Sequence, residues 1–330
     1  MSCFWRSNRR PVRYTIKVVP DAPPNVQLEL PSVGESITPT AELPARLTID
    51  DNYGLGGVAL RVQRGDEPAF DVPLEGFAAG RREFLVETFI AISTFHATPG
   101  DHLRVRAEAS DLDPSGPNIG RAGPIELRVI TPTDFLAELA ARELELRREF
   151  ERLLSAQRGL TDGLERLLPE LAGADSPPPA LAERFASLAR RQDSHAATCL
   201  QLRQRFAQIL DEMRINKVAR SGDERRIGQH IITPLEKLGT SAMPSASARI
   251  NELRGGAGAD LAETLPAAQG EILRQMEAIL ANMLEWESYR EVVVLLQEII
   301  DIQAAVHAAT VDNLEQQLDQ ILGLEEPTEP

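Results

Sequence analysis

The chain has little cysteine, few aromatic side chains and no long apolar run. Cys3 and Cys199 are its only cysteines, which excludes a disulfide-stabilised scaffold and a zinc site built mainly from thiolates. Aromatic residues make up 5% of the sequence, which is low for an all-β or carbohydrate-stacking protein. No run of about 18 apolar residues occurs, so we expect no membrane span in this chain. Residues 1–10 are basic but no apolar segment follows them, so the sequence as written shows no secretory signal, and we expect a cytoplasmic location if the chain is complete as written.

The chain has fewer basic than acidic side chains. Lys and Arg number 35 against 50 Asp and Glu, for a formal charge of −15, which argues against nucleic acid or an anionic lipid surface as the main partner. Residues 131–330 hold 21 of the basic and 33 of the acidic residues. This acidity fits either a solvated outer face or a docking surface for a basic protein partner.

The first 130 residues have the pattern of short strands. Seven segments alternate apolar and polar side chains and end at Pro, Gly, Asp or Asn: residues 14–19, 26–30, 45–49, 58–62, 83–86, 102–107 and 125–130. This spacing predicts an immunoglobulin-like β-sandwich over residues 21–131. Residues 13–20 resemble the last strand, residues 125–132, so residues 1–20 are either the orphan end of a preceding module or the first strand of this one.

After residue 131 the period changes to that of helices. Thr131 and Asp134 can cap a helix start, and leucines then recur every seven residues from Leu139 to Leu167. A second apolar stripe covers residues 181–213, and a third segment, 227–253, contains Pro234 and Pro244 as kinks or restarts. The longest stripe covers residues 265–321. We expect an all-α antiparallel coiled-coil or helical bundle over residues 132–322, then a disordered acidic tail at 323–330, within an α+β multidomain chain. A homo-oligomer could also form through the coiled coil.

Two acidic loops could bind a metal. Asp50 and Asp51 join two strands, and paired carboxylates can hold a metal or do acid–base work, although Asp, Asn and Gly also make tight turns. Asp111, Asp113, Ser115 and Asn118 resemble the first half of a calcium loop, but position twelve is Ala122 rather than Glu. The sequence therefore favours polar turns at both places.

Three side chains on the helical stripes could bind zinc or form a nucleophile pair. His195 and Cys199 lie four residues apart on one helix face, and His307 lies on the stripe of the last helix. A lone polar residue on such a stripe more often fixes register or pairs with a glutamine on a neighbouring helix. We expect no bound metal, no cofactor and no catalytic residue.

Met276, Met283 and Trp286 form a soft apolar set on the last helix. Methionine adapts well to varied partners, so these residues could bind a protein partner. Their spacing equally fits the helical core.

Several of these segments together resemble a known family. The segment Asp51-Asn-Tyr-Gly-Leu55, the strand and turn at Val105–Asp111, and the helical residues Met283-Leu-Glu-Trp-Glu287, Tyr289 and Ile299-Ile-Asp-Ile-Gln303 resemble large uncharacterised bacterial envelope proteins, chiefly of planctomycetes, akin to domain-of-unknown-function family 4175. The resemblance covers about residues 13–320 and implies immunoglobulin-like modules followed by long helices in a membrane-anchored chain. It carries no catalytic residues, and Asn52 departs from the usual second acidic residue.

We therefore expect a non-enzymatic structural or interaction protein of the cell envelope. Its β module would be a spacer or adhesion unit, and its helices a docking rod for an unidentified protein partner. The alternatives are a metal-dependent or hydrolytic enzyme using Asp50 and Asp51 or the His195, Cys199 and His307 set, and a cytoplasmic adaptor.

Overall fold

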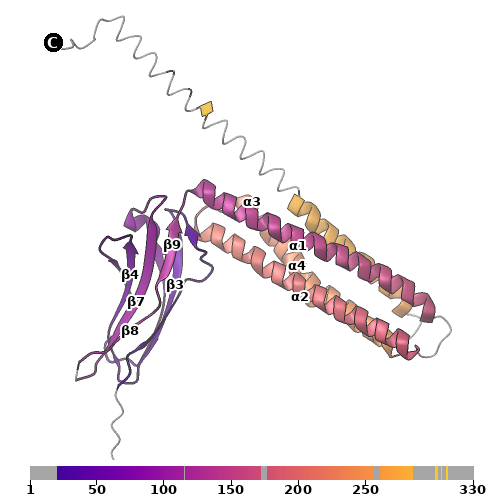
Figure 1. Ribbon diagram of the computed structural model, residues 1–330, viewed down its shortest axis with the longest axis horizontal. Helices are drawn as coiled ribbons and strands as arrows, with labels where there is room; N and C mark the ends of the chain where they lie inside the picture. Colours follow the sequence, from indigo (N-terminus) through magenta and orange to yellow (C-terminus); the bar gives the residue numbers. More distant parts are fainter. Residues whose placement is uncertain are drawn as a thin grey trace, which may run out of the picture. The chain divides into compact units, whose positions relative to one another are not determined.

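Strands precede helices along the chain, as expected for an α+β protein. The computed structural model describes residues 21–114, 116–171, 177–255 and 261–284, with Ile302, Gln303, Val306 and Thr310. The chain divides into two units. The first contains the described residues up to Ala137 together with Asp211–Val218, and the second contains Glu138–Leu210 and the described residues from Ala219 onward (Figure 1). The division thus falls inside the first and second long helices rather than at residue 131.

The first unit contains two β-sheets. Its strands are β1 (Asn25–Glu29), β2 (Ser36–Ile37), β3 (Glu42–Asp50), β4 (Leu55–Arg64), β5 (Phe70–Val72), β6 (Glu83–Ala91), β7 (His102–Asp111), β8 (Ile119–Arg121) and β9 (Ile125–Val129). One sheet has the order β1-β3-β6 and is antiparallel throughout. The other has the order β2-β9-β7-β4-β5, with β8 paired to β7, and its only parallel pair in the described chain is β2–β9.

One apolar core lies between these sheets. Along β3, Leu43, Leu47 and Ile49 are buried, whereas Arg46 between them is exposed, because successive side chains of a strand point to opposite faces. The same core takes in buried residues of β4, β6, β7 and β9. Six of the seven expected strands are found, and residues 14–19 lie outside the described residues. The sequence missed β2, β5 and β8, since strands of two or three residues are too short to show a period.

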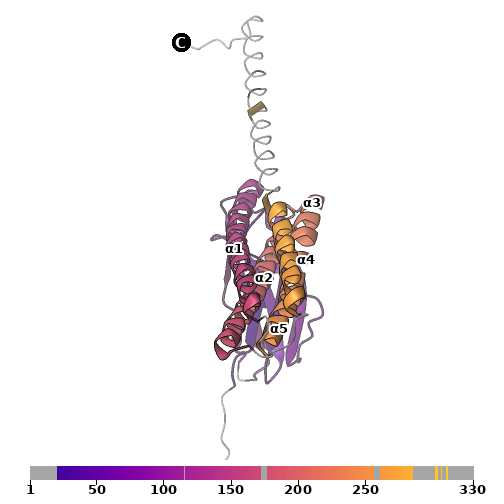
Figure 2. The ribbon, with the colours of Figure 1, turned by 90° about the vertical axis from the view of Figure 1, so that its right-hand side faces the viewer.

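The second unit is helical. Its elements are α1 (Pro132–Leu167, whose first residues belong to the first unit), a 3₁₀ turn at Leu168–Leu171, α2 (Pro179–Ile215), α3 (Ser221–Asp223), α4 (Thr233–Lys237), α5 (Met243–Arg254) and a helix at residues 261–284. Thr131 caps α1 as expected, because its hydroxyl accepts a hydrogen bond from the amide of Asp134 at 3.0 Å. The helices lie alongside one another (Figure 2).

The seven-residue stripes are buried as the sequence predicts. The buried members are Leu139, Leu146, Leu153, Leu160 and Leu167 on α1; Leu181, Phe185, Leu188, Cys199, Leu202, Phe206 and Ile209 on α2; and Leu265, Ile272, Met276, Ile279 and Met283 on the last described helix. These stripes face one another rather than water, which accounts for most of the stability of such long helices. Continuity of the last helix to residue 322 lies outside the described residues.

Pro234 and Pro244 do restart helical segments. Each follows a π-helical stretch, at Glu224–Ile232 and Leu238–Ala242, and each lies at the second residue of α4 or α5. The amide of Thr233 donates to the carbonyl of Gly228, and that of Met243 to Leu238, both five residues back. A proline has no amide hydrogen, so widening the turn before it keeps the neighbouring backbone groups paired.

The last turn of α2 and the residues directly after it belong to the first unit. There Asn216 Oδ1 accepts a hydrogen bond from the amide of Thr38 at 2.7 Å, and the Thr38 hydroxyl donates to the Asn216 carbonyl at 2.9 Å. Both residues are almost completely buried. Lys217 then turns the chain with a positive φ of 56°, and the amide of Val218 donates to the Met213 carbonyl, a common helix ending.

Replacing Asn216 with alanine should lower the free energy of unfolding by about 1–3 kcal/mol, because the buried amide of Thr38 loses its acceptor. Urea unfolding followed by circular dichroism measures this loss. The matched control is Asn282→Ala, whose side chain donates to the Ala278 carbonyl of its own helix. An equal effect of both substitutions would contradict the assignment of Asn216.

Candidate functional site

The Asp111 loop is held together by its own hydrogen bonds. Asp111 lies at the end of β7 and is buried. Its Oδ1 accepts from the amides of Asn118 at 2.8 Å and Asp113 at 3.2 Å, and its Oδ2 accepts from the Asn118 side chain at 2.8 Å. These partners are donors, which compete with a cation for the carboxylate oxygens. The Asp111 carboxylate therefore stabilises the turn that follows β7, and Ser115 lies outside the described residues.

The Asp51 carboxylate also braces a turn. Its Oδ2 accepts from the amides of Tyr53 at 2.7 Å and Gly54 at 2.6 Å, and Gly54 has a φ of 126°, which glycine adopts without strain. Asp50 accepts from the Asn25 side chain at 2.9 Å on the exposed face of β1 and β3. Asp51 thus stabilises the turn, whereas its neighbour Asp50 links β3 to β1.

Asp21, which the sequence analysis did not single out, joins these two loops. Burial raises the pKa of the Asp21 carboxyl, and the nearby charges of Asp111 and Asp51 raise it further, against hydrogen bonds from Asn52 and Ala22 that lower it. Burial also acts to raise the pKa of Asp111, but hydrogen bonds from Asn118 and Asp113 outweigh it and lower that pKa. Three carboxyl groups from separate segments therefore gather at one end of the β unit.

Among the described residues, no group of three or more His, Cys, Asp or Glu side chains is arranged to hold a metal ion. The buried Oδ1 of Asp51 has no hydrogen-bond partner in the described part of the chain.

A layer of buried glutamines lies inside the helical unit. Gln157 of α1, Gln192 of α2 and Gln269 of the helix at 261–284 are each 0% exposed. Gln157 Nε2 donates to Gln192 Oε1 at 3.0 Å and to Gln269 Oε1 at 2.7 Å. In return, Gln192 Nε2 donates to Gln157 Oε1 at 3.2 Å, and Gln269 Nε2 donates to Gln192 Oε1 at 3.0 Å. Each amide thus both donates and accepts, and the three helices are joined at one level.

His195 belongs to this glutamine layer. Its Nδ1 lies 2.7 Å from Gln157 Oε1, and because an amide oxygen can only accept, Nδ1 carries the proton. Burial lowers the pKa of His195, and the charge of Arg191 lowers it further. The imidazole is therefore neutral at pH 7 and pairs with a glutamine on a neighbouring helix, one of the two roles the sequence favoured.

Cys199 is inert in this environment. It is fully buried, its thiol lies 3.8 Å from the Met243 sulfur, and burial raises its pKa to about 12. A thiol must lose its proton to act as a nucleophile or metal ligand, so this cysteine suits neither role near neutral pH. His307, the third member of the expected set, lies outside the described residues.

Of this layer, the sequence analysis singled out His195 but did not name its three glutamines, Gln269 among them. The signal was present, because Gln269 lies seven residues before Met276 on the same stripe. Met276 and Met283 are only 0% and 6% exposed, so they belong to the core and not to an open partner surface. Trp286 lies outside the described residues.

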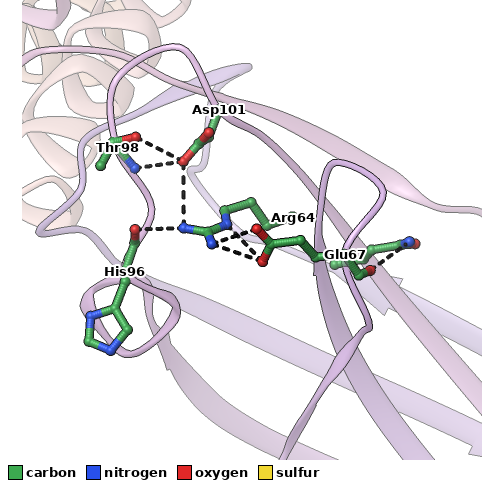
Figure 3. A network of polar contacts seen from close by, with 6 residues as sticks. Arg64, Glu67, His96, Thr98 and Asp101 are labelled. Carbon is green, nitrogen blue, oxygen red and sulfur yellow. Dashed lines mark hydrogen bonds and ion pairs between the residues drawn. The ribbon is translucent and has the colours of Figure 1, made fainter.

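A further polar network lies at the other end of the strands, away from Asp111. Arg64 of β4 donates to both carboxylate oxygens of Glu67 and to the His96 carbonyl at 2.8 Å, and lies 3.9 Å from Asp101 (Figure 3). Asp101 in turn accepts from the amide of Thr98 at 2.7 Å, the main cause of its lowered pKa. The network joins two loops, and the Arg64 guanidinium is bound to acceptors from both of them.

A surface hollow of about 330 Å³ lies on the helical unit. It is lined by Gly163, Arg166, Leu167, Arg184, Ser187 and Leu188. Arg184 pairs with Glu170 at 3.0 Å. The lining includes none of the candidate catalytic residues, so the hollow does not bring that chemistry together.

Replacing Gln192 alone with leucine should lower the free energy of unfolding by about 2–4 kcal/mol, because Gln157 and Gln269 each lose an acceptor inside the core. Replacing Gln157, Gln192, Gln269 and His195 together with leucine should cost less than the single change, since no buried amide then lacks a partner. Urea unfolding of both variants tests this, with exposed Gln201→Leu as the control. A quadruple variant that loses more unfolding free energy than the Gln192→Leu variant would contradict a layer in which the four side chains satisfy one another.

Replacing His195 with leucine should remove part of the acid sensitivity of the protein. The native pKa is lowered, so the unfolded state takes up the proton first, and stability falls as pH drops below about 6.5. The variant should match the parent within about 1 kcal/mol at pH 8, because Gln157 Oε1 keeps its bond from Gln192. Urea midpoints at pH 8, 7, 6 and 5 should diverge in favour of the variant, whereas exposed His230→Leu should follow the parent.

Within the described residues, none of the helices combines the length and apolar character needed to cross a lipid bilayer. A scan against protein-family models finds no match. Searches of curated proteins and of solved structures likewise find no matching protein.

Proposed function

We propose that this chain is a non-enzymatic structural and interaction protein of the bacterial cell envelope. In this proposal the β unit is an immunoglobulin-like module that acts as a spacer or adhesion unit. The helical unit is a coiled-coil-like rod on which a protein partner docks.

The topology of the β unit supports the first part. Sheets of order β1-β3-β6 and β9-β7-β4-β5 around one core correspond to strands A, B and E facing strands G, F, C and C′. Immunoglobulin-like modules share this division of strands. Such modules mostly hold or present surfaces, although fold alone does not assign a function.

The observation that carries the proposal is the glutamine layer. Its three amides and His195 engage one another, so the most polar part of the described helical interior is committed to joining helices. Polar residues at such positions fix register and partner choice among helices. A helical assembly of defined register is what a docking rod requires.

The use of the other candidate groups agrees with this proposal. Asp51 and Asp111 bind backbone amides, and Cys199 is buried with a raised pKa. General acid–base or nucleophilic catalysis needs groups that are free to meet a substrate. The envelope location rests on the family resemblance of segments such as Asp51–Leu55.

Fractionation of the cells of origin tests the location. Antibodies against this chain should detect it in the envelope fraction, separated from a cytosolic marker enzyme. Recovery with the cytosolic marker would overturn the envelope proposal and favour the cytoplasmic adaptor.

A further inference from the structure

The edge strand β6 differs from the other edges of the two sheets. It lies at the end of the order β1-β3-β6, so in the described chain no strand pairs with its outer side. Backbone amides and carbonyls on that side are available to another strand. With nine residues paired to β3 in an unbroken register, β6 is long and regular.

The other edges carry the protections that natural sheets use. Strands β2, β5 and β8 have only two or three residues, and β1 turns the polar side chains Asn25, Gln27 and Glu29 outward. Short strands and polar faces discourage pairing with another chain. By contrast, β6 contains no proline, lysine or bulge.

The outward face of β6 is apolar at two positions. Leu85 is 66% exposed and Phe89 is 71% exposed, and Glu87 lies between them. Single exposed apolar residues are ordinary, but two on the outward face of an unpaired edge strand favour association with another strand. Their neighbours across β3 are Thr48 and Pro44, which are only half-buried, so the face has no cover from its own sheet.

The sequence of β6 is complementary to itself. In an antiparallel pair of two copies centred on Glu87, Leu85 of each copy lies opposite Phe89 of the other, and the backbone edges pair along the whole strand. Shifting the centre by one residue places Leu85 against Glu87 and Phe89 against Glu83. The register centred on Glu87 is therefore the one that covers both apolar side chains on both copies.

The charges on this face are compatible with that register. Glu87 forms an ion pair with Arg46 of β3 at 2.9 Å. Two glutamates opposite each other would repel, but each is paired with Arg46 of its own copy, which also lies 3.8 Å from Glu29 of β1, so the repulsion is reduced.

We propose that the β6 edge is a homodimerisation site. Two copies of this chain pair β6 to β6 in antiparallel fashion, joining the three-stranded sheets into one six-stranded sheet. The partner is thus a second copy, and the contact is made by the β unit and not by the helices. This inference goes beyond the proposed function, because it depends on the β unit alone and not on where in the cell the chain acts.

Sedimentation of the full chain over a range of concentrations tests the proposal. The parent should show a monomer–dimer equilibrium, and Leu85→Lys or Phe89→Lys should raise the dimer dissociation constant by at least about tenfold, because lysine on an edge opposes strand pairing. The matched control, Gln27→Lys on the other edge of the same sheet, should leave it unchanged. A parent that stays monomeric, or a dimer that persists in both lysine variants, would overturn the proposal.

Disulfide trapping gives a second test that does not depend on the lysine variants folding. In a Cys3→Ser background, Glu87→Cys places two cysteines opposite each other, where neighbouring antiparallel strands bring Cα atoms to about 4.5–5.5 Å, within disulfide range. Mild oxidation should yield a covalent dimer, whereas Gln27→Cys should not. Equal trapping of both variants, or none, would refute the β6 pairing, while the envelope location is judged separately by cell fractionation.

Discussion

Polar groups that leave water must find partners inside the protein, and this constraint shapes both units. In the helical unit it produces the layer in which Gln157, Gln192 and Gln269 satisfy one another. An apolar core alone would let long helices slide by whole turns, because one leucine resembles the next. The three glutamine amides can bond to one another in only one alignment of the helices, so they prevent such sliding.

The same constraint explains the contacts of the residues that the sequence offered as candidates for catalysis or metal binding. Asp111 lies at the end of a central strand, where its carboxylate accepts hydrogen bonds from the loop that follows. Asp51 does the same in its turn. His195 is kept neutral by burial and donates to an amide. In each case the group that suggested catalysis or metal binding satisfies a structural need close by.

At the outer edge of β6, the backbone polar groups have no partner strand in the described chain. A strand in the middle of a sheet pairs on both sides, whereas an edge strand exposes half of its backbone groups. The short strands β2 and β5 make this harmless at the other sheet's edges. On β6, a full-length edge coincides with exposed Leu85 and Phe89, and this coincidence distinguishes an interaction surface from ordinary exposed side chains.

Local patterns in the sequence determined which segments are strands and which are helices. Alternation reports strands and a seven-residue period reports helices, since both arise from the geometry of a single element. For that reason six strands and the buried stripes of α1 and α2 were predictable, and so was the pairing of a polar stripe residue such as His195 with a glutamine. Only the tertiary structure decided that Asp21 lies near Asp51 and Asp111, that Asn216, just after α2, accepts a hydrogen bond from Thr38, and that β6 lies at an edge. These facts depend on which distant segments become neighbours, and no periodicity within one segment carries that information.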